Sequence, residues 1–246
     1  MKLASAYARA VSRLFEELDR QPTPIGEISL RRRLEPTLQI DVWEVKIGED
    51  GLMSSLITDG EEAVATLGLA ATPNDPLDVV VGGLGLGYTA GTALLDPRVR
   101  SVRVVDALEP VIDWHRRRLV PLEPSLVDDD RCELVHADFF ELATGGFAFG
   151  SDAPSMFDAI LLDIDHSPRH LLDPANATFY EPAGTERLAS ALNSGGVFSL
   201  WSNDEPDDEY LRVLRSTFDT ADAHIVTFPN PLTDTPTSST IYVATI

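Results

Sequence analysis

Val79-Val80-Val81-Gly82-Gly83-Leu84-Gly85-Leu86-Gly87 is the stretch that decides the fold class of this chain. A run of β-branched residues that opens into alternating glycines is typical of an α/β protein whose first strand brings backbone close to a nucleoside. Gly83, Gly85 and Gly87 have the spacing G-x-G-x-G, and Tyr88 stands where a dinucleotide-binding loop has its third glycine. This spacing favours an adenosyl-sulfonium ligand over NAD. We expect the three glycines to bind that nucleoside.

Strands and helices alternate from this stretch onward. Apolar runs predict strands at 77–81, 101–105, 132–136, 157–162, 197–201, 223–228 and 239–244. Helices are expected after the glycine loop, around Pro110, over 176–192, where Asn193-Ser194-Gly195-Gly196 closes the helix, and around 207–218. This order predicts an α/β fold with a doubly wound, mostly parallel, seven-stranded Rossmann-like sheet. The final strands are expected to be antiparallel at one edge.

The segment before residue 60 has a different pattern. Met1–Gln21 places apolar residues at helical spacing, which predicts an amphipathic helix, and Arg9 and Arg13 interrupt the apolar run that a signal peptide needs. Three predicted strands follow, and Gly48-Glu49-Asp50-Gly51 joins the last two as a hairpin. We therefore divide the chain into an N-terminal helix and β-hairpin element, residues 1–60, and a nucleoside-binding, catalytic domain, residues 61–246. The first element offers a surface for a homodimer.

The composition excludes several classes of partner. The formal net charge is −21, from 19 Lys and Arg against 40 Asp and Glu. Such a field repels phosphate backbones, so no nucleic-acid partner is expected, whereas cationic small molecules such as amines are attracted. Solubility or a salt-adapted source is the simpler explanation of the acidity. No apolar run is long enough to cross a membrane, and the single Cys132 excludes an internal disulfide, so we expect a cytoplasmic protein.

Acidic residues follow three of the predicted parallel strands. Asp106 ends the second strand, Asp138 follows the third, and Asp163 and Asp165 follow the fourth together with His166. Ligands of open α/β sheets bind at the carboxyl ends of the strands, so these side chains are expected in one site. A single aspartate after a strand also caps the next helix, and at Asp138 that explanation is equally good.

These segments resemble the polyamine aminopropyltransferases (spermidine and spermine synthases), within the class I S-adenosylmethionine-dependent methyltransferase fold. The resemblance covers roughly residues 38 to 203. It is carried by the glycine loop at 80–87, Val-Arg-Ser-Val-Arg-Val-Val-Asp at 99–106, Glu-Pro-Val-Ile-Asp at 109–113, His-Ala-Asp-Phe-Phe at 136–140, Phe-Asp-Ala-Ile-Leu-Leu-Asp at 157–163, Phe-Tyr at 179–180 and Gly-Gly-Val-Phe-Ser-Leu-Trp-Ser at 195–202. Asp59-Gly60 resembles the Asp-Gly that follows the family's N-terminal hairpin.

The resemblance implies a role for each acidic position. Asp106 would hold the ribose hydroxyls, Asp138 and Phe139 would meet the adenine, and Asp163 would face the transferred group and the incoming amine. Transfer from a sulfonium is an in-line displacement that requires positioning and a neutral amine but no metal. A carboxylate beside the amine can accept its proton, which makes Asp163 the candidate general base.

Two further residues complete the candidate catalytic group. Asp165 is a possible second carboxylate, and His166 is a group that titrates near neutrality. The five histidines show no metal-ligand spacing, so no metal is expected. The expected cofactor is S-adenosylmethionine or its decarboxylated form.

The chain departs from the family pattern on the amine side. Gly85 stands where the family's glycine loop usually has an acid, and Leu108 stands where an acid follows strand two. His166 takes the place of the second aspartate in Asp-Ser-(Ser/Thr)-Asp-Pro. After Gly60 the chain continues Glu61-Glu62-Ala63-Val64-Ala65-Thr66-Leu67, without the glutamine and Tyr-His-Glu that build the family's amine pocket.

Three hypotheses follow from this pattern. The first is a transferase that moves an aminopropyl group from a decarboxylated S-adenosylmethionine-type donor to a small amine. The second is a methyltransferase that uses S-adenosylmethionine with an unidentified acceptor. The third is a non-catalytic nucleoside-binding protein that acts in assembly.

Overall fold

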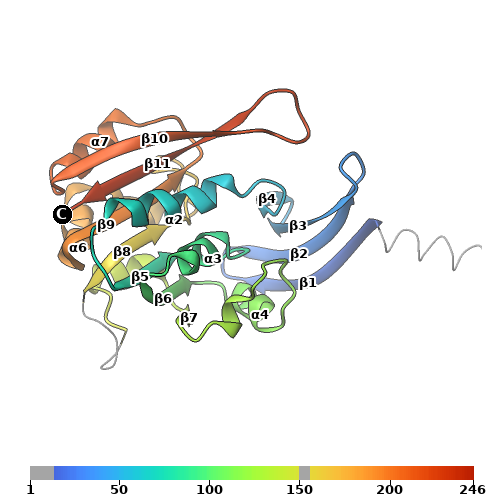
Figure 1. The fold of residues 1–246 in the computed structure, drawn as a ribbon. Helices are drawn as coiled ribbons and strands as arrows, with labels where there is room; N and C mark the ends of the chain where they lie inside the picture. The colour runs from blue at the N-terminus through green and yellow to red at the C-terminus, as the bar shows by residue number, and fades with distance from the viewer. Residues whose placement is uncertain (1–13, 150–155) are drawn as a thin grey trace, which may run out of the picture.

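The computed structural model describes residues 14–149 and 156–246, which form two β-sheets (Figure 1). The N-terminal sheet is antiparallel with the order β1-β2-β3-β4. Its strands are β1 (Phe15–Thr23), β2 (Gly26–Glu35), β3 (Ile40–Ile47) and β4 (Asp50–Ser54). The main sheet has the order β10-β11-β9-β8-β5-β6-β7. Its strands are β5 (Leu77–Gly82), β6 (Val99–Asp106), β7 (Cys132–His136), β8 (Phe157–Leu162), β9 (Leu192–Ser202), β10 (Thr220–Phe228) and β11 (Thr237–Thr245).

The direction of the strands confirms the predicted fold class. Neighbouring strands from β9 through β8, β5 and β6 to β7 are parallel. β11 is antiparallel to both of its neighbours, β9 and β10. The main sheet is therefore seven-stranded and mostly parallel, with its antiparallel pairs at one side. The carboxyl ends of β5, β6, β7 and β8 all lie at the same edge of the sheet.

Helices cover both faces of the main sheet (Figure 1). One face packs against α2 (Asp59–Ala71), α3 (Tyr88–Leu95) and α4 (Glu109–Arg116), and the other against α5 (Phe139–Thr144), α6 (Pro182–Ser190) and α7 (Asp208–Arg215). Val79 and Val81 of β5 belong to the first core, and Val80 belongs to the second. A strand covered on both faces is apolar along nearly all of its length. In β5 and β8 only the second residue, Asp78 or Asp158, is charged, which is why both strands could be recognised from sequence.

The predicted helix over Met1–Gln21 is wrong in the part that the structure describes. Phe15–Thr23 forms strand β1, paired antiparallel with β2. The prediction for residues 1–13 lies outside the described residues. Charged residues that suggested a polar helix face instead pair across the two strands, as Glu16 Oε2 does with Arg32 at 2.8 Å. Pairing with β2 therefore determines the structure of this segment, although its apolar residues have the spacing of a helix.

Two further differences concern helices. The predicted helix over 176–192 is divided into the 3-10 helix η2 (Pro174–Tyr180) and α6, with Pro182 at the start of the second. Asn193–Gly196 belongs to β9 rather than to a closing turn. Helix α2 was not predicted at all.

The predicted hairpin at residues 48–51 is confirmed, because β3 and β4 pair antiparallel there. A second 3-10 helix, η1, spans Leu126–Asp128.

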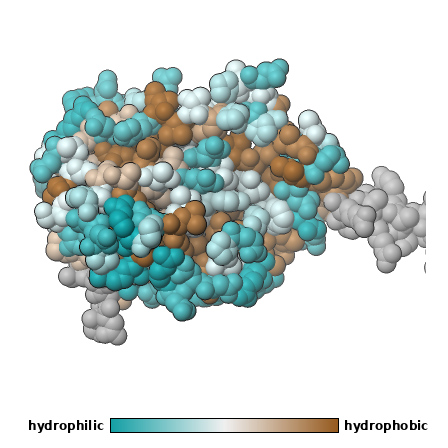
Figure 2. All heavy atoms as spheres, in the orientation of Figure 1, coloured by the Kyte–Doolittle hydropathy of each residue, from teal (hydrophilic) through white to brown (hydrophobic). Residues whose placement is uncertain are grey.

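The N-terminal sheet packs directly on the main domain. Trp43 Nε1 donates a hydrogen bond to the Leu119 carbonyl at 3.0 Å, and Trp114 Nε1 donates to Asp19 Oδ2 at 2.8 Å. Hydrophobic side chains gather at this end of the molecule in Figure 2. Phe15, at the start of β1, and Ile25, in the turn after it, are both exposed. Within the described residues, no helix has the length and apolar character needed to cross a membrane.

Candidate active site

The glycine loop lies against the end of β8. Gly83 has φ +90° and Gly85 has φ +46°, backbone conformations that favour glycine. A Cβ atom at Gly83 would collide with the Asp163 carbonyl, and one at Gly82 would lie 2.5 Å from the Phe139 ring. The main chain at Gly82 and Gly83, which has no side chains, therefore packs closely against Asp163 and Phe139. This is the close approach that a nucleoside-binding loop requires.

Asp106 is fixed by the same loop. Its Oδ2 accepts a hydrogen bond from Leu84 N at 3.0 Å, and its Oδ1 accepts one from Leu108 N at 2.8 Å. Burial raises the pKa of Asp106, while these amide bonds oppose that rise. Each carboxylate oxygen has two lone pairs, so both can still accept a hydrogen bond from a hydroxyl. The geometry suits a carboxylate that binds a ribose diol.

A cavity of about 220 Å3 opens at these strand ends. Five carboxyl groups line it, those of Glu61, Asp106, Asp138, Asp163 and Asp173. Much of its apolar wall comes from the N-terminal sheet and its first turn, through Ile25, Val45, Leu52 and Met53. None of the described residues that line it is a lysine or an arginine. The cavity is therefore suited to a ligand with apolar surface and positive charge.

Seven of the nine residues selected from sequence line this one cavity: Gly83, Gly85, Asp106, Asp138, Phe139, Asp163 and His166. Asp138 also caps α5, because its Oδ1 accepts hydrogen bonds from Phe140 N at 2.7 Å and Glu141 N at 3.1 Å. The helix cap considered for this aspartate is therefore present, and the same residue lines the cavity.

The other two selected residues are not in the lining. Gly87 precedes α3, where a Cβ atom would lie 2.8 Å from the His115 ring. Asp165 is 1% exposed and accepts hydrogen bonds from Leu172 N at 2.7 Å and Tyr180 Oη at 2.8 Å. Its carboxylate thus holds the loop that follows β8 in place.

Asp163 is linked to α2 through Thr89. Thr89 Oγ1 lies 3.1 Å from Asp163 Oδ2 and 3.2 Å from the main-chain carbonyl of Glu61. Burial raises the pKa of Asp163 to about 6. Burial, and next the negative charge of Asp163, raise the pKa of Glu61 to about 8. Two carboxyl groups that repel each other hold one proton between them at neutral pH.

Glu61 was not among the residues selected from sequence. Its signal was the pair of acids directly after Asp59-Gly60, at a place where the expected amine-pocket residues are missing. Its placement depends on α2, which was not predicted. Only the fold brings it beside Asp163, 102 residues further along the chain.

Two other residues that shape the glycine loop were also missed. Met53 Sδ accepts a hydrogen bond from Leu86 N at 3.1 Å, and the Met53 side chain fills the space that a Cβ atom at Gly85 would need. His115 Nε2 lies 2.9 Å from the Gly85 carbonyl. Burial lowers the pKa of His115 to about 4, so the neutral ring donates this hydrogen bond.

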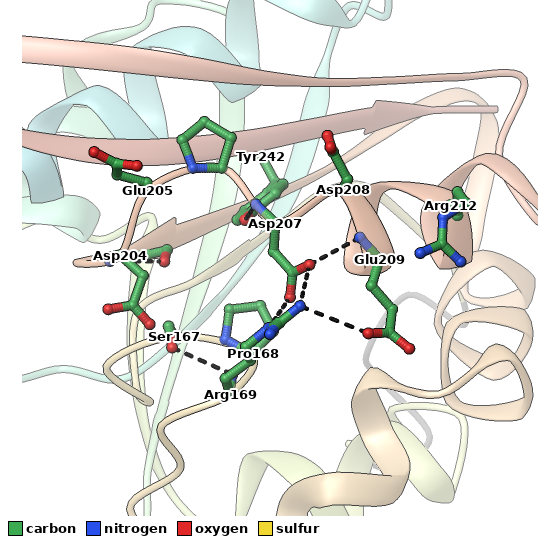
Figure 3. Close-up of a pocket in the computed structure, with 12 residues that line it drawn as sticks. Ser167, Pro168, Arg169, Asp204, Glu205, Asp207, Asp208, Glu209, Arg212 and Tyr242 are labelled. Atoms are coloured by element: carbon green, nitrogen blue, oxygen red, sulfur yellow. Dashed lines mark hydrogen bonds and ion pairs between the residues drawn. The ribbon is translucent and has the colours of Figure 1, made fainter.

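A second cavity, of about 500 Å3, lies between the loop after β8 and the start of α7 (Figure 3). Arg169 points into the cluster of acids there, with Nε 2.5 Å from Asp207 Oδ2 and Nη2 3.6 Å from Glu209 Oε2. Asp207 and Glu209 of this cavity thus have a cationic partner within the chain. The carboxylates of the first cavity lack one among the described residues.

The sequence resembles two groups of transferases over about half of the chain. It is 28% identical to a polyamine aminopropyltransferase of Saccharolobus islandicus over 128 residues, which are 52% of this chain and 39% of that protein. It is 29% identical to putrescine N-methyltransferase 1 of Nicotiana tabacum over 148 residues, 57% of this chain and 35% of that protein. The match therefore spans well under half of either relative. No protein-family model matches the sequence.

The fold resembles that of spermidine synthase. The structure of the Thermotoga maritima enzyme superposes with a TM-score of 0.69 over 93% of this chain and 72% of that one, at 19% identity. This likeness concerns the fold. Together with the sequence relatives, it confirms the predicted resemblance to polyamine aminopropyltransferases on a methyltransferase-type sheet.

Proposed function

We propose that this protein transfers an aminopropyl group from decarboxylated S-adenosylmethionine to a small amine. The observation that carries the proposal is the position of Asp163. Its carboxyl group shares one cavity with the glycine loop and Asp106, and no lysine or arginine among the described residues lines that cavity. The resemblance to polyamine aminopropyltransferases supports the same assignment.

The described residues fit the nucleoside part of the donor. The main chain at Gly83 and Gly85 would approach it closely, because neither position has a side chain and both line the cavity. A Cβ atom at either position would collide with a neighbouring residue. Asp106 would accept hydrogen bonds from the ribose hydroxyls. Asp138 and the edge of Phe139 would meet the adenine. The apolar wall from the N-terminal sheet would exclude water from the reacting centre.

The charge of the cavity favours the decarboxylated donor. An S-adenosylmethionine carboxylate would enter a site already lined by Glu61 and Asp163, with no described cationic side chain in the lining to receive it. The ammonium and sulfonium of the decarboxylated form would instead be attracted. We infer that the transferred group carries a positive charge.

The chemistry needs one base and a fixed geometry. The bound donor would supply the carbon that the amine attacks, so that a C–N bond forms, the C–S bond breaks, and its electron pair stays on sulfur in neutral methylthioadenosine. Asp163 would take the proton that the acceptor nitrogen must lose, because an alkylamine is protonated at neutral pH. Thr89 would hold the Asp163 carboxylate toward the cavity.

The test combines ligand binding with product analysis. We expect decarboxylated S-adenosylmethionine and methylthioadenosine to raise the melting temperature, because both bind the native state. Mass spectrometry after incubation with a panel of diamines and polyamines should show a product enlarged by one aminopropyl group. Binding of the nucleosides without product from any amine would contradict the proposal.

One observation favours a methyltransferase as the second candidate. Gly85 has no acidic side chain, and Met53 occupies the space such a side chain would take. An acid that could hold the donor's ammonium at this position is therefore absent. A relative named putrescine N-methyltransferase matches the chain equally well. Methylated amine formed from S-adenosylmethionine, with no aminopropylated product, would establish this alternative.

A further inference from the structure

We propose that Glu61 and Asp163 form a two-carboxylate binding site for one primary ammonium group. The inference rests on the proposed function and assigns a ligand class to a part of the cavity where the sequence lacks the expected amine-pocket residues. Glu61 is the new residue in this assignment. It takes part as a binding group, and Asp163 remains the base.

The start of α2 fixes Glu61 at the cavity. Gly60 is buried, and a Cβ atom there would lie 2.6 Å from Trp201 Nε1 and 2.9 Å from Ser239 Oγ. The first turn of α2 is therefore pressed against the ends of β9 and β11. Thr89 Oγ1 joins the Glu61 carbonyl to Asp163. These contacts fix the main chain at Glu61, and its side chain lines the same cavity as the Asp163 carboxylate.

The groups that face Glu61 supply no positive charge. Asp163 acts on it from the end of β8, Glu62 and Asp59 from its own helix, and the Tyr88 hydroxyl from α3. His166 is the one basic side chain among the described residues lining the cavity. By contrast, two well-buried carboxylates elsewhere have cationic partners, Asp78 in Arg100 and Asp207 in Arg169.

A missing cation has a measurable consequence. Without ligand, Glu61 keeps its proton at pH 7, because burial and, next, the negative charge of Asp163 raise its pKa to about 8. An ammonium group between the two carboxyls offsets these effects, and Glu61 then ionises. Its proton leaves to the buffer, so binding of the ammonium and release of about one proton are linked.

The ammonium has two possible sources, the aminopropyl arm of the donor and the acceptor amine. Calorimetric titrations at pH 7, in buffers of different ionisation enthalpy, separate them. In one arm decarboxylated S-adenosylmethionine and methylthioadenosine, which has no ammonium, are titrated into the protein. In the other, 1,4-diaminobutane is titrated into the methylthioadenosine complex. Glu61→Gln keeps the shape of the protonated side chain, and Glu62→Gln, one exposed position along, is the matched control.

We expect wild type and Glu62→Gln to release about one proton in one of the two arms, and Glu61→Gln to release none there and to bind that ligand about ten- to hundredfold more weakly. Methylthioadenosine should bind all three proteins equally, which shows that the variants are folded. Equal proton release and affinity in wild type and Glu61→Gln, in both arms, would overturn the assignment while leaving the proposed function intact. Failure of wild type to bind any nucleoside would refute both.

Discussion

Replacing Glu61 by glutamine should stabilise the ligand-free protein progressively as the pH rises. The folded-state pKa of Glu61 is about 8, against an ordinary value of 4.5. Between these values the folded protein binds a proton that the unfolded chain has lost, so the free energy of unfolding falls with pH. The contribution of Glu61 is fully present below pH about 4.5 and is lost as the pH rises through about 8. Glutamine does not titrate and carries no such dependence.

The size of the effect follows from the pKa. Each pH unit in this window costs about 1.4 kcal/mol per proton, and the slope flattens as pH 8 is reached. From pH 6 to pH 8 the wild type should lose about 2 kcal/mol relative to Glu61→Gln. The free energy of unfolding of a typical native protein is roughly 5–15 kcal/mol, so this loss is a large part of it.

Urea unfolding at pH 6, 7 and 8 measures this difference. The gap in unfolding free energy between Glu61→Gln and wild type should widen by about 2 kcal/mol from pH 6 to pH 8. Glu62→Gln should follow the wild type, because Glu62 is exposed at the neighbouring position. Parallel curves for wild type and Glu61→Gln across the three pH values would refute the burial of an uncompensated carboxyl group at this site.

Three further predictions concern the nucleoside and the base. Asp106→Ala should weaken methylthioadenosine binding about ten- to hundredfold, since it removes a charged hydrogen-bond acceptor; an unchanged dissociation constant would exclude Asp106 from the ribose site. Asp163→Asn should lower turnover about 100- to 10,000-fold with nucleoside binding retained, and wild-type kcat/KM should fall below pH about 6 as Asp163 is protonated; a flat profile would speak against this base. Gly83→Ala should lower stability by more than about 1 kcal/mol in urea unfolding, because its Cβ would meet the Asp163 carbonyl at φ +90°.

The main sheet and much of the site could be predicted from sequence for a simple reason. Strands β5 and β8 are buried along their whole length and apolar except at their second residues, Asp78 and Asp158, because both of their faces are covered. The acids after the parallel strands converge at one edge of the sheet. Local pattern was sufficient for Asp106 and Asp163.

What sequence could not give depends on long-range packing. β1 has a helical apolar spacing, but its hydrogen bonds and ion pairs come from β2. Met53 and His115 act on the glycine loop from 32 and 30 residues away, as measured from Gly85. Glu61 could be recognised only once α2 placed it beside Asp163.

The contact between Met53 and Gly85 means that a substitution at one position changes what is tolerated at the other. An aspartate at position 85 would collide with Met53, and a smaller residue at position 53 would leave a void while Gly85 remains. Each single change is therefore unfavourable. Met53→Ala combined with Gly85→Asp removes the collision, and the strain of a side chain at φ +46° is the cost that remains. The effects of substitutions at these two positions are therefore not additive. A change of donor preference at this loop is easier to obtain by engineering both residues at once than by successive single mutations.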